Sequence, residues 1–418
     1  MSRHEPPTAL VSLLLPVVLL GLLAEIQDEG DPVVSDLHGT VMVGYQGWFT
    51  AAGDGLGAGF VHWGRVDADP PRCTVDMWPD LAEYGDDERF PTSYRHIDGR
   101  AAEVFSSFHP ETVRRHFRWM REYEIDGAFV QRFATAIRPG DPEHWNDRRT
   151  NAVLRNCRAA ANEFGRAFAV MYDTDFDAAT CAKLKADWTR LRRDMRLLET
   201  NAYLHHEGGP LIALWGYGFR HRELDVDAAR DLFEFLTAPE NGGCRLMLGV
   251  PNDWAEWDGP RRAVLDRYAS VVSPWNVGRY RSNETADAHF ARRWPGDLEA
   301  CERTGADYLP VVFPGFSWTN LKRGEAPLDQ IPRRKGAFYW HQLEKVRAYG
   351  MDCAYVAMFD EVDEGTAIFK VTNDPPVGAF VTYEGLPSDH YLELTRQGRR
   401  LLRGEPVRLP PPLGEGGR

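Results

Sequence analysis

The feature that most constrains the fold of this 418-residue chain is a repeat of short apolar runs that alternate with helical patterns. The runs lie at residues 41–45, 128–133, 168–173, 211–215, 245–250, 270–275, 308–313 and 353–359. Between them, apolar residues recur at intervals of three and four, as in Cys181, Leu184 and Trp188. Strands that alternate with helices predict a parallel α/β sheet, and eight of them predict a closed (β/α)8 TIM barrel.

Two segments depart from this repeat. Residues 46–127 are too many for a simple loop and contain Trp63 and Trp78, so we expect an ordered excursion over the barrel mouth. After the eighth strand, residues 380–383 predict an added strand, and Ser388 or Asp389 could cap a helix that runs through Leu402. One domain is therefore expected over residues 32–402, followed by a short Pro/Gly-rich tail at 403–418.

The first 31 residues have the order of a signal peptide. Arg3 precedes an apolar run at residues 9–24, and an acidic segment follows it. The run is shorter than the roughly 18 to 20 residues that a spanning helix needs. We expect export to the periplasm, the cell surface or the medium. The alternative is an uncleaved anchor, because Leu22-Leu-Ala24 is a poor cleavage site.

Charge and motif content exclude several function classes. The formal net charge of -13 disfavours nucleic acid, because phosphate binding requires clustered Lys and Arg. The six cysteines form no CxxC pair. Asp173-Thr-Asp175 and His205-His-Glu207 match metal motifs only weakly, so no metal is expected. Neither a GxSxG elbow nor a phosphate-binding glycine loop precedes a helix, and no cofactor is expected.

Aromatic and hydrogen-bonding residues follow the predicted strands, at the end of the barrel where active sites lie. The candidate substrate-binding residues are Tyr45, Gln46, Trp48, Gln131, Arg132, Tyr172, Asp173, Trp215, Trp254, Trp275, Asn276, Arg279, Tyr280 and Trp318. Flat aromatic faces match the apolar faces of sugar rings, and amides and carboxylates bind hydroxyls. The pattern predicts an oligo- or polysaccharide ligand. For any single tryptophan, the alternative is packing at the barrel rim.

The eighth strand runs directly into four acids, Asp360, Glu361, Asp363 and Glu364. Like charges at this density raise one another's pKa values, and two carboxyl groups with different pKa values suit general acid–base catalysis. The alternative is a solvated polar turn, with Gly365 supplying a positive φ.

The segment Phe359-Asp-Glu-Val-Asp-Glu-Gly-Thr-Ala-Ile368 resembles the corresponding segment of glycoside hydrolase family 99, the endo-α-mannosidases. The Glu-x-x-Glu-Gly-Thr core falls on Glu361 and Glu364. Residues 43–49, 125–133, 273–280 and 386–392 resemble a broader group of family 71/99-like bacterial proteins, some labelled xylosidase or arabinosidase. This resemblance extends over most of residues 40–402.

The resemblance implies a retaining hydrolase with Glu361 and Glu364 as its catalytic pair. By this resemblance, Glu361 would deprotonate the sugar 2-hydroxyl to form an epoxide-like intermediate, and Glu364 would be the general acid/base. In this sequence Val362-Asp363 replaces an aromatic residue and a His, and Asp360 replaces Asn. The sugar therefore stays open between α-mannan, α-glucan and xylose- or arabinose-containing polymers. The second hypothesis is a carbohydrate-binding barrel without catalytic activity.

Overall fold

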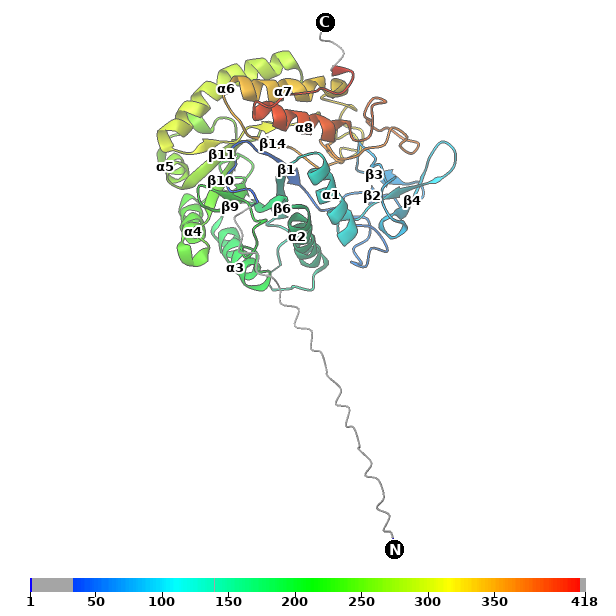
Figure 1. The fold of residues 1–418 in the computed structure, drawn as a ribbon, viewed down its shortest axis with the longest axis horizontal. Coiled ribbons are helices and arrows are strands. Elements are labelled where there is room, and N and C mark those ends of the chain that lie inside the picture. The colour runs from blue at the N-terminus through cyan, green and yellow to red at the C-terminus, as the bar shows by residue number, and fades with distance from the viewer. Residues whose placement is uncertain (2–32, 139, 414–418) are drawn as a thin grey trace.

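The computed structural model describes residues 1, 33–138 and 140–413, and in it parallel strands form a barrel wall surrounded by helices (Figure 1). The strands of the wall are β1 (Val41–Tyr45), β6 (Gly127–Phe133), β7 (Ala167–Asp173), β9 (Gly209–Trp215), β10 (Arg245–Val250), β11 (Ala269–Pro274) and β14 (Ala354–Val356), together with the two pieces of a further strand. Each pairs in parallel with its neighbours in the order predicted from the sequence.

The barrel is closed by an interrupted strand. Its first piece, β12 (Asp307–Tyr308), pairs with β11, and its second piece, β13 (Val311–Val312), pairs with β14. Since β14 pairs with β1, the sheet returns to its first strand. Pro310 lies between the two pieces and has no N–H to donate, but its carbonyl accepts the Tyr355 N–H at 2.9 Å. The predicted (β/α)8 barrel is confirmed.

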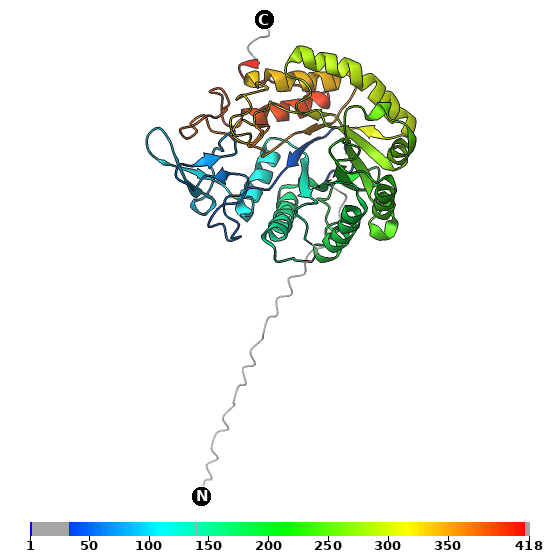
Figure 2. The same ribbon diagram turned by 180° about the vertical axis from the view of Figure 1, so that it is seen from behind.

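A helix follows each of the eight strands and packs on the outside of the barrel (Figures 1 and 2). The helices are α1 (Pro110–Glu122), α2 (Trp145–Phe164), α3 (Ala178–Asp194), α4 (Val226–Thr237), α5 (Gly259–Tyr268), α6 (Asn283–Thr304), α7 (Ala337–Ala348) and α8 (His390–Leu402). In α3 the predicted apolar face is the buried one, with Cys181, Leu184 and Trp188 all turned inward. No helix in the described ranges is both long and apolar enough to cross a membrane.

The excursion after β1 is ordered, as predicted. It contains two antiparallel pairs, β2 (Gly64–Arg65) with β3 (Arg72–Cys73) and β4 (Phe90–Arg95) with β5 (Ala101–Val104), and it projects at one side of the barrel (Figures 1 and 2). The N–H groups of Asp76 and Met77 donate to the carbonyl of Val362 at 2.9 and 3.2 Å. The excursion is therefore attached directly to the acidic segment.

The predicted strand at residues 380–383 is wrong. This segment crosses the excursion, where Phe380 packs edge-on against Trp78 and the Val381 N–H donates to the Asp76 carbonyl at 2.7 Å. The predicted helix is α8. Asp389 occupies its N-cap position but does not cap it, because the carboxylate accepts the Tyr123 hydroxyl instead. The predicted signal peptide lies outside the described residues.

Candidate active site

The alternation of side chains along a barrel strand separates residues that face the interior from residues that face the helices. Gly44 faces inward, where an added Cβ would overlap the Met358 and Tyr355 side chains. Its neighbour Tyr45 therefore faces outward, and its hydroxyl lies 2.9 Å from Nδ1 of His116 on α1. Gln46 is the next residue to face the interior.

Six of the predicted substrate-binding residues are buried in the layer between strands and helices. They are Tyr45, Arg132, Tyr172, Trp254, Asn276 and Tyr280. Tyr280 donates to Gln342 on α7 at 2.9 Å, and the Asn276 amide donates to the Val311 carbonyl at 3.2 Å. As they lie, these side chains support the wall of the barrel and offer no surface to a substrate. Their interpretation as substrate ligands is corrected accordingly.

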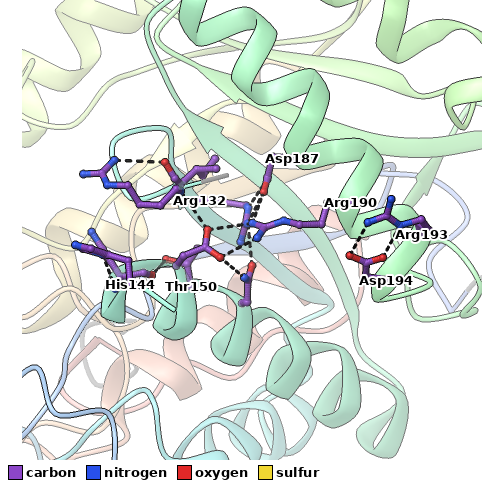
Figure 3. Close-up of polar contacts among 12 residues, drawn as sticks. Arg132, His144, Thr150, Asp187, Arg190, Arg193 and Asp194 are labelled. Carbon is purple, nitrogen blue, oxygen red and sulfur yellow. Dashed lines mark hydrogen bonds and ion pairs between the residues drawn. The ribbon is translucent and has the colours of Figure 1, made fainter. Parts of the chain in front are cut away.

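Arg132 belongs to a buried ion network that joins β6 to two helices (Figure 3). It donates to both carboxylate oxygens of Asp187 at 2.6 and 2.7 Å, and Arg190 donates to Asp187 and to Asp147. Burial opposes ionisation of Asp187, but Arg132 and Arg190 hold its pKa below the usual value. Tyr172 also donates to Asp187, at 2.7 Å. The network fixes α2 and α3 against β6 and β7.

Asp360 fixes the backbone that follows β1. Its buried carboxylate accepts the backbone N–H groups of Gln46 and Gly47 at 2.8 and 2.9 Å. Burial raises the pKa of Asp360 to about 7, against the opposing effect of these donors. Gly47 has a φ of 57°, in the left-handed region that favours glycine.

Glu361 lies next to this junction and is only 5% exposed. Its carboxylate accepts the side-chain amide of Gln46 and the hydroxyl of Thr366, both at 2.6 Å. Burial, and then the charges of Glu364 and Asp363, raise the pKa of Glu361 well above its usual value. Gln46, predicted to bind substrate, is thus a direct partner of Glu361.

Glu364 lines a cavity of about 290 Å³ together with Trp275, Phe316 and Trp318. Burial, and then the charge of Asp363, raise the pKa of Glu364 to about 7, while Lys322 opposes this shift. The Lys322 ammonium lies 4.4 Å from the centre of the Trp318 ring. Two of the predicted tryptophans therefore share a cavity with one of the predicted catalytic carboxylates.

Trp48 is not among the residues that line the cavity of Glu364. Its ring stacks on His62 at a centroid distance of 4.0 Å and on Phe133 at 5.3 Å, so protein contacts already occupy much of its surface. His62 Nδ1 in turn lies 3.2 Å from the Asp363 carboxylate. The sequence analysis did not identify His62, since a lone His in a long excursion carries no spacing signal. Its φ of 63° marks it as an unusual backbone position.

The remaining predicted substrate-binding residues lie in the barrel interior or at the carboxyl ends of β7, β9 and β11. They are Gln131, Asp173, Trp215 and Arg279. The Gln131 amide donates to the Tyr355 hydroxyl at 3.2 Å in the barrel interior. Asp173 pairs with Arg222, and burial raises its pKa to about 6 although Arg222 opposes the shift. Trp215 meets Trp275 edge-on at 5.7 Å, and Arg279 is exposed beyond them. In the part of the chain that the structure describes, no group of three or more His, Cys, Asp or Glu side chains is arranged to hold a metal ion.

Known proteins resemble this chain in fold and not in sequence. No protein-family model matches the sequence, and no curated protein is significantly similar. Two solved structures of the GH99 endo-alpha-mannosidase from Bacteroides thetaiotaomicron match with TM-scores of 0.62 and 0.61, at 15% and 14% identity. Each match covers 88% of this chain and 98% of that chain. This chain shares the fold of that enzyme. A structure described as a glycoside hydrolase-like protein matches with a TM-score of 0.51 at 14% identity, over 73% of this chain and 89% of its own.

Proposed function

We propose that this protein is a glycoside hydrolase that cleaves a glycan with Glu361 and Glu364 as its acid–base pair. The observation that carries the proposal is the unequal environment of two neighbouring buried carboxyl groups at the barrel mouth. Glu361 is hydrogen-bonded by Gln46 and Thr366, whereas Glu364 faces a cavity with two tryptophans. The fold shared with an endo-α-mannosidase supports this proposal.

The two carboxyl groups have different roles because their surroundings favour different protonation states. Two negative charges in one buried segment repel each other, so the pair retains a proton near neutral pH. Gln46 and Thr366 donate to Glu361 and stabilise its carboxylate. Within the described chain the Glu364 side chain accepts no hydrogen bond, and Asp363 further disfavours its charge. Burial raises the pKa of both groups and acts most strongly on Glu361. We nevertheless assign the proton of the pair to Glu364, because Glu361 has two hydrogen-bond donors that favour its charged form and Glu364 has none among the described residues.

This distribution suits a general acid at Glu364 and a general base at Glu361. Glu364 protonates the oxygen of the leaving sugar. Glu361 takes the proton of the 2-hydroxyl, and the 2-oxygen bonds to the anomeric carbon as the bond to the leaving sugar breaks, as the family resemblance implies. A water molecule that gives its proton to Glu364 then opens this epoxide-like intermediate at the anomeric carbon, and Glu361 returns its proton to the 2-oxygen. Two displacements at one carbon leave the product with its original anomeric configuration. Trp275 and Trp318 supply flat apolar surfaces for the sugar rings beside Glu364.

The proposal is tested by incubating residues 32–418 with α-mannan, α-glucan and arabinoxylan and measuring the size of the products. We expect at least one polymer to be cleaved by the parent, and a loss of about 100-fold or more in the Glu361→Gln variant, in line with removal of a general base. Binding without cleavage by the parent would instead support the carbohydrate-binding barrel. Equal cleavage by the parent and Glu361→Gln would exclude Glu361 as a catalytic residue.

A further inference from the structure

A second cavity, of about 430 Å³, lies at the β9–β11 side of the barrel mouth. Its volume falls within the roughly 300 to 1,000 Å³ of small-molecule sites. Arginines from three parts of the chain converge on it. Arg220 follows β9, Arg279 follows β11, and Arg292 and Arg293 lie on α6.

The charge of this cavity is opposite to that of the whole chain. Four arginines line it against one carboxylate, Asp253, although the chain has 62 acidic and 49 basic residues. Arg293 pairs with Glu256, whereas Arg220, Arg279 and Arg292 form no ion pair with the described residues. Unpaired arginines that line one cavity repel one another, and an anion bound among them would offset that repulsion.

His289 lies in the wall of this cavity, and the charge of the arginines affects its pKa. Burial, and then Arg293, Arg279 and Arg292, lower the pKa of His289 to about 4. His289 is therefore neutral at neutral pH. Its Nε2 lies 3.2 Å from Oδ1 of Asn276 and can donate to it, which leaves Nδ1 as an acceptor for a ligand hydroxyl.

A pair of tryptophans connects the arginine cavity to the cavity of Glu364. Phe219 in the arginine cavity stacks on Trp215 at 4.5 Å, and Trp215 contacts Trp275, which lines the Glu364 cavity. Asn252, also in the arginine cavity, donates to the Trp275 carbonyl at 2.6 Å. A bound chain of sugars could therefore extend from Glu364 across Trp275 to the arginines.

We propose that the arginine cavity binds an anionic sugar of the substrate, through the carboxylate of a uronic acid or a sulfate ester. The proposal rests on the proposed glycan hydrolysis and names the substrate class of that site as acidic. Guanidinium groups bind both oxyanions through paired N–H donors, and the open arginines provide such donors on two sides of the cavity.

The test compares matched polymers by affinity electrophoresis at two salt concentrations. The probes are glucuronoxylan and its carboxyl-reduced form, and chemically sulfated α-mannan and unsulfated α-mannan. The variant is Arg279→Gln with Arg292→Gln, two exposed residues whose loss leaves the core intact. The control is Arg148→Gln with Arg155→Gln, which removes the same charge from two exposed arginines of α2.

We expect at least one acidic polymer to bind about tenfold or more tightly than its neutral partner, as for charge-assisted pairs. The cavity variant should lose this difference, the α2 control should keep it, and higher salt should reduce it. A preference for glucuronoxylan over its carboxyl-reduced form would identify a carboxylate as the bound group. A preference for sulfated over unsulfated α-mannan would identify a sulfate ester. Arg279→Lys with Arg292→Lys should retain part of the preference, because it keeps the charge but not the paired donors.

Three results would overturn the proposal: equal binding of acidic and neutral polymers, equal losses in both double variants, and no binding of any probe by the parent. Hydrolysis is measured on the same polymers. Cleavage without an acidic preference would reject the arginine site but not the hydrolase, and an arginine-dependent acidic preference without cleavage would reject the hydrolase alone.

Discussion

The side-chain amide of Gln46 donates a 2.6 Å hydrogen bond to the carboxylate of Glu361, across 315 positions of sequence. The contact exists because β1 and β14 are adjacent at the closure of the barrel. Asp360 holds the backbone of Gln46 in place, because its carboxylate accepts the N–H groups of Gln46 and Gly47. The first and last strands of the barrel thus jointly build the environment of one carboxyl group.

Replacing Gln46 by Ala should raise the pKa of Glu361, since the amide hydrogen bond favours the charged form. A hydrogen bond to a charged group contributes about 1.5 to 3 kcal/mol, or about one to two pH units. If Glu361 is the base, the rising limb of the plot of kcat/KM against pH should shift to higher pH by about one to two units. Gln330→Ala, in the Glu364 cavity wall, is the control and should leave the limb in place. An unmoved limb in Gln46→Ala would argue against Glu361 as the titrating base.

Asp360→Asn should flatten the dependence of thermal stability on pH. Because burial raises the pKa of Asp360 from 3.8 to about 7, the folded state binds more protons than the unfolded state between these values. The contribution of Asp360 to stability therefore falls as pH rises through this window. The Tm of the variant minus that of the parent should increase from pH 4 to pH 7 by about a few degrees. Asp67→Asn, at an exposed position, should show no such trend.

The sequence predicts the strands and helices well because their apolar periodicity reflects burial that the barrel requires. It predicts the mouth less well. Whether a residue after a strand faces the mouth depends on the pleat, and a shift of one position separates Gln46 from Tyr45 and Gln131 from Arg132. No periodicity in the chain indicates this register. Contacts from the excursion, such as that of His62 with Asp363, join residues 301 positions apart and leave no local pattern.

Alanine at Trp275 or Trp318 should weaken glycan binding by roughly 1 to 3 kcal/mol each, because their rings line the cavity of Glu364. Trp48→Ala should have a smaller direct effect, since its ring stacks on His62 and Phe133. Isothermal titration calorimetry on the folded variants measures these differences. Trp145→Ala, on α2, is the control. Unchanged affinity in a folded Trp275→Ala, Trp318→Ala double variant would assign both rings to packing alone.

We also propose that the chain is exported, because Arg3 and the apolar run at residues 9–24 have the order of a signal peptide. Cell fractionation followed by N-terminal sequencing should find the protein outside the cytosol without its first residues. A membrane-bound protein with an intact N-terminus would indicate an anchor. A full-length protein in the cytosol would exclude both.

Glu364→Gln should separate protonation of the leaving group from the rest of the reaction. The variant keeps the shape of the side chain but cannot deliver a proton, so hydrolysis of a natural glycan should fall by about 100-fold or more. A substrate with a nitrophenolate leaving group needs no acid, and its hydrolysis should recover much of the parent rate.

The same variant should also change the pH profile. Since the pKa of Glu364 is raised to about 7, the parent should lose activity on natural glycan as pH rises through that value. This falling limb should be absent when the variant hydrolyses the activated substrate, because no acid remains to be deprotonated. Glu325→Gln, at an exposed position beyond Trp318, is the matched control and should behave as the parent. Equal losses on both substrates would show that Glu364 does not act as the acid, and its place beside Trp275 and Trp318 would then reflect binding.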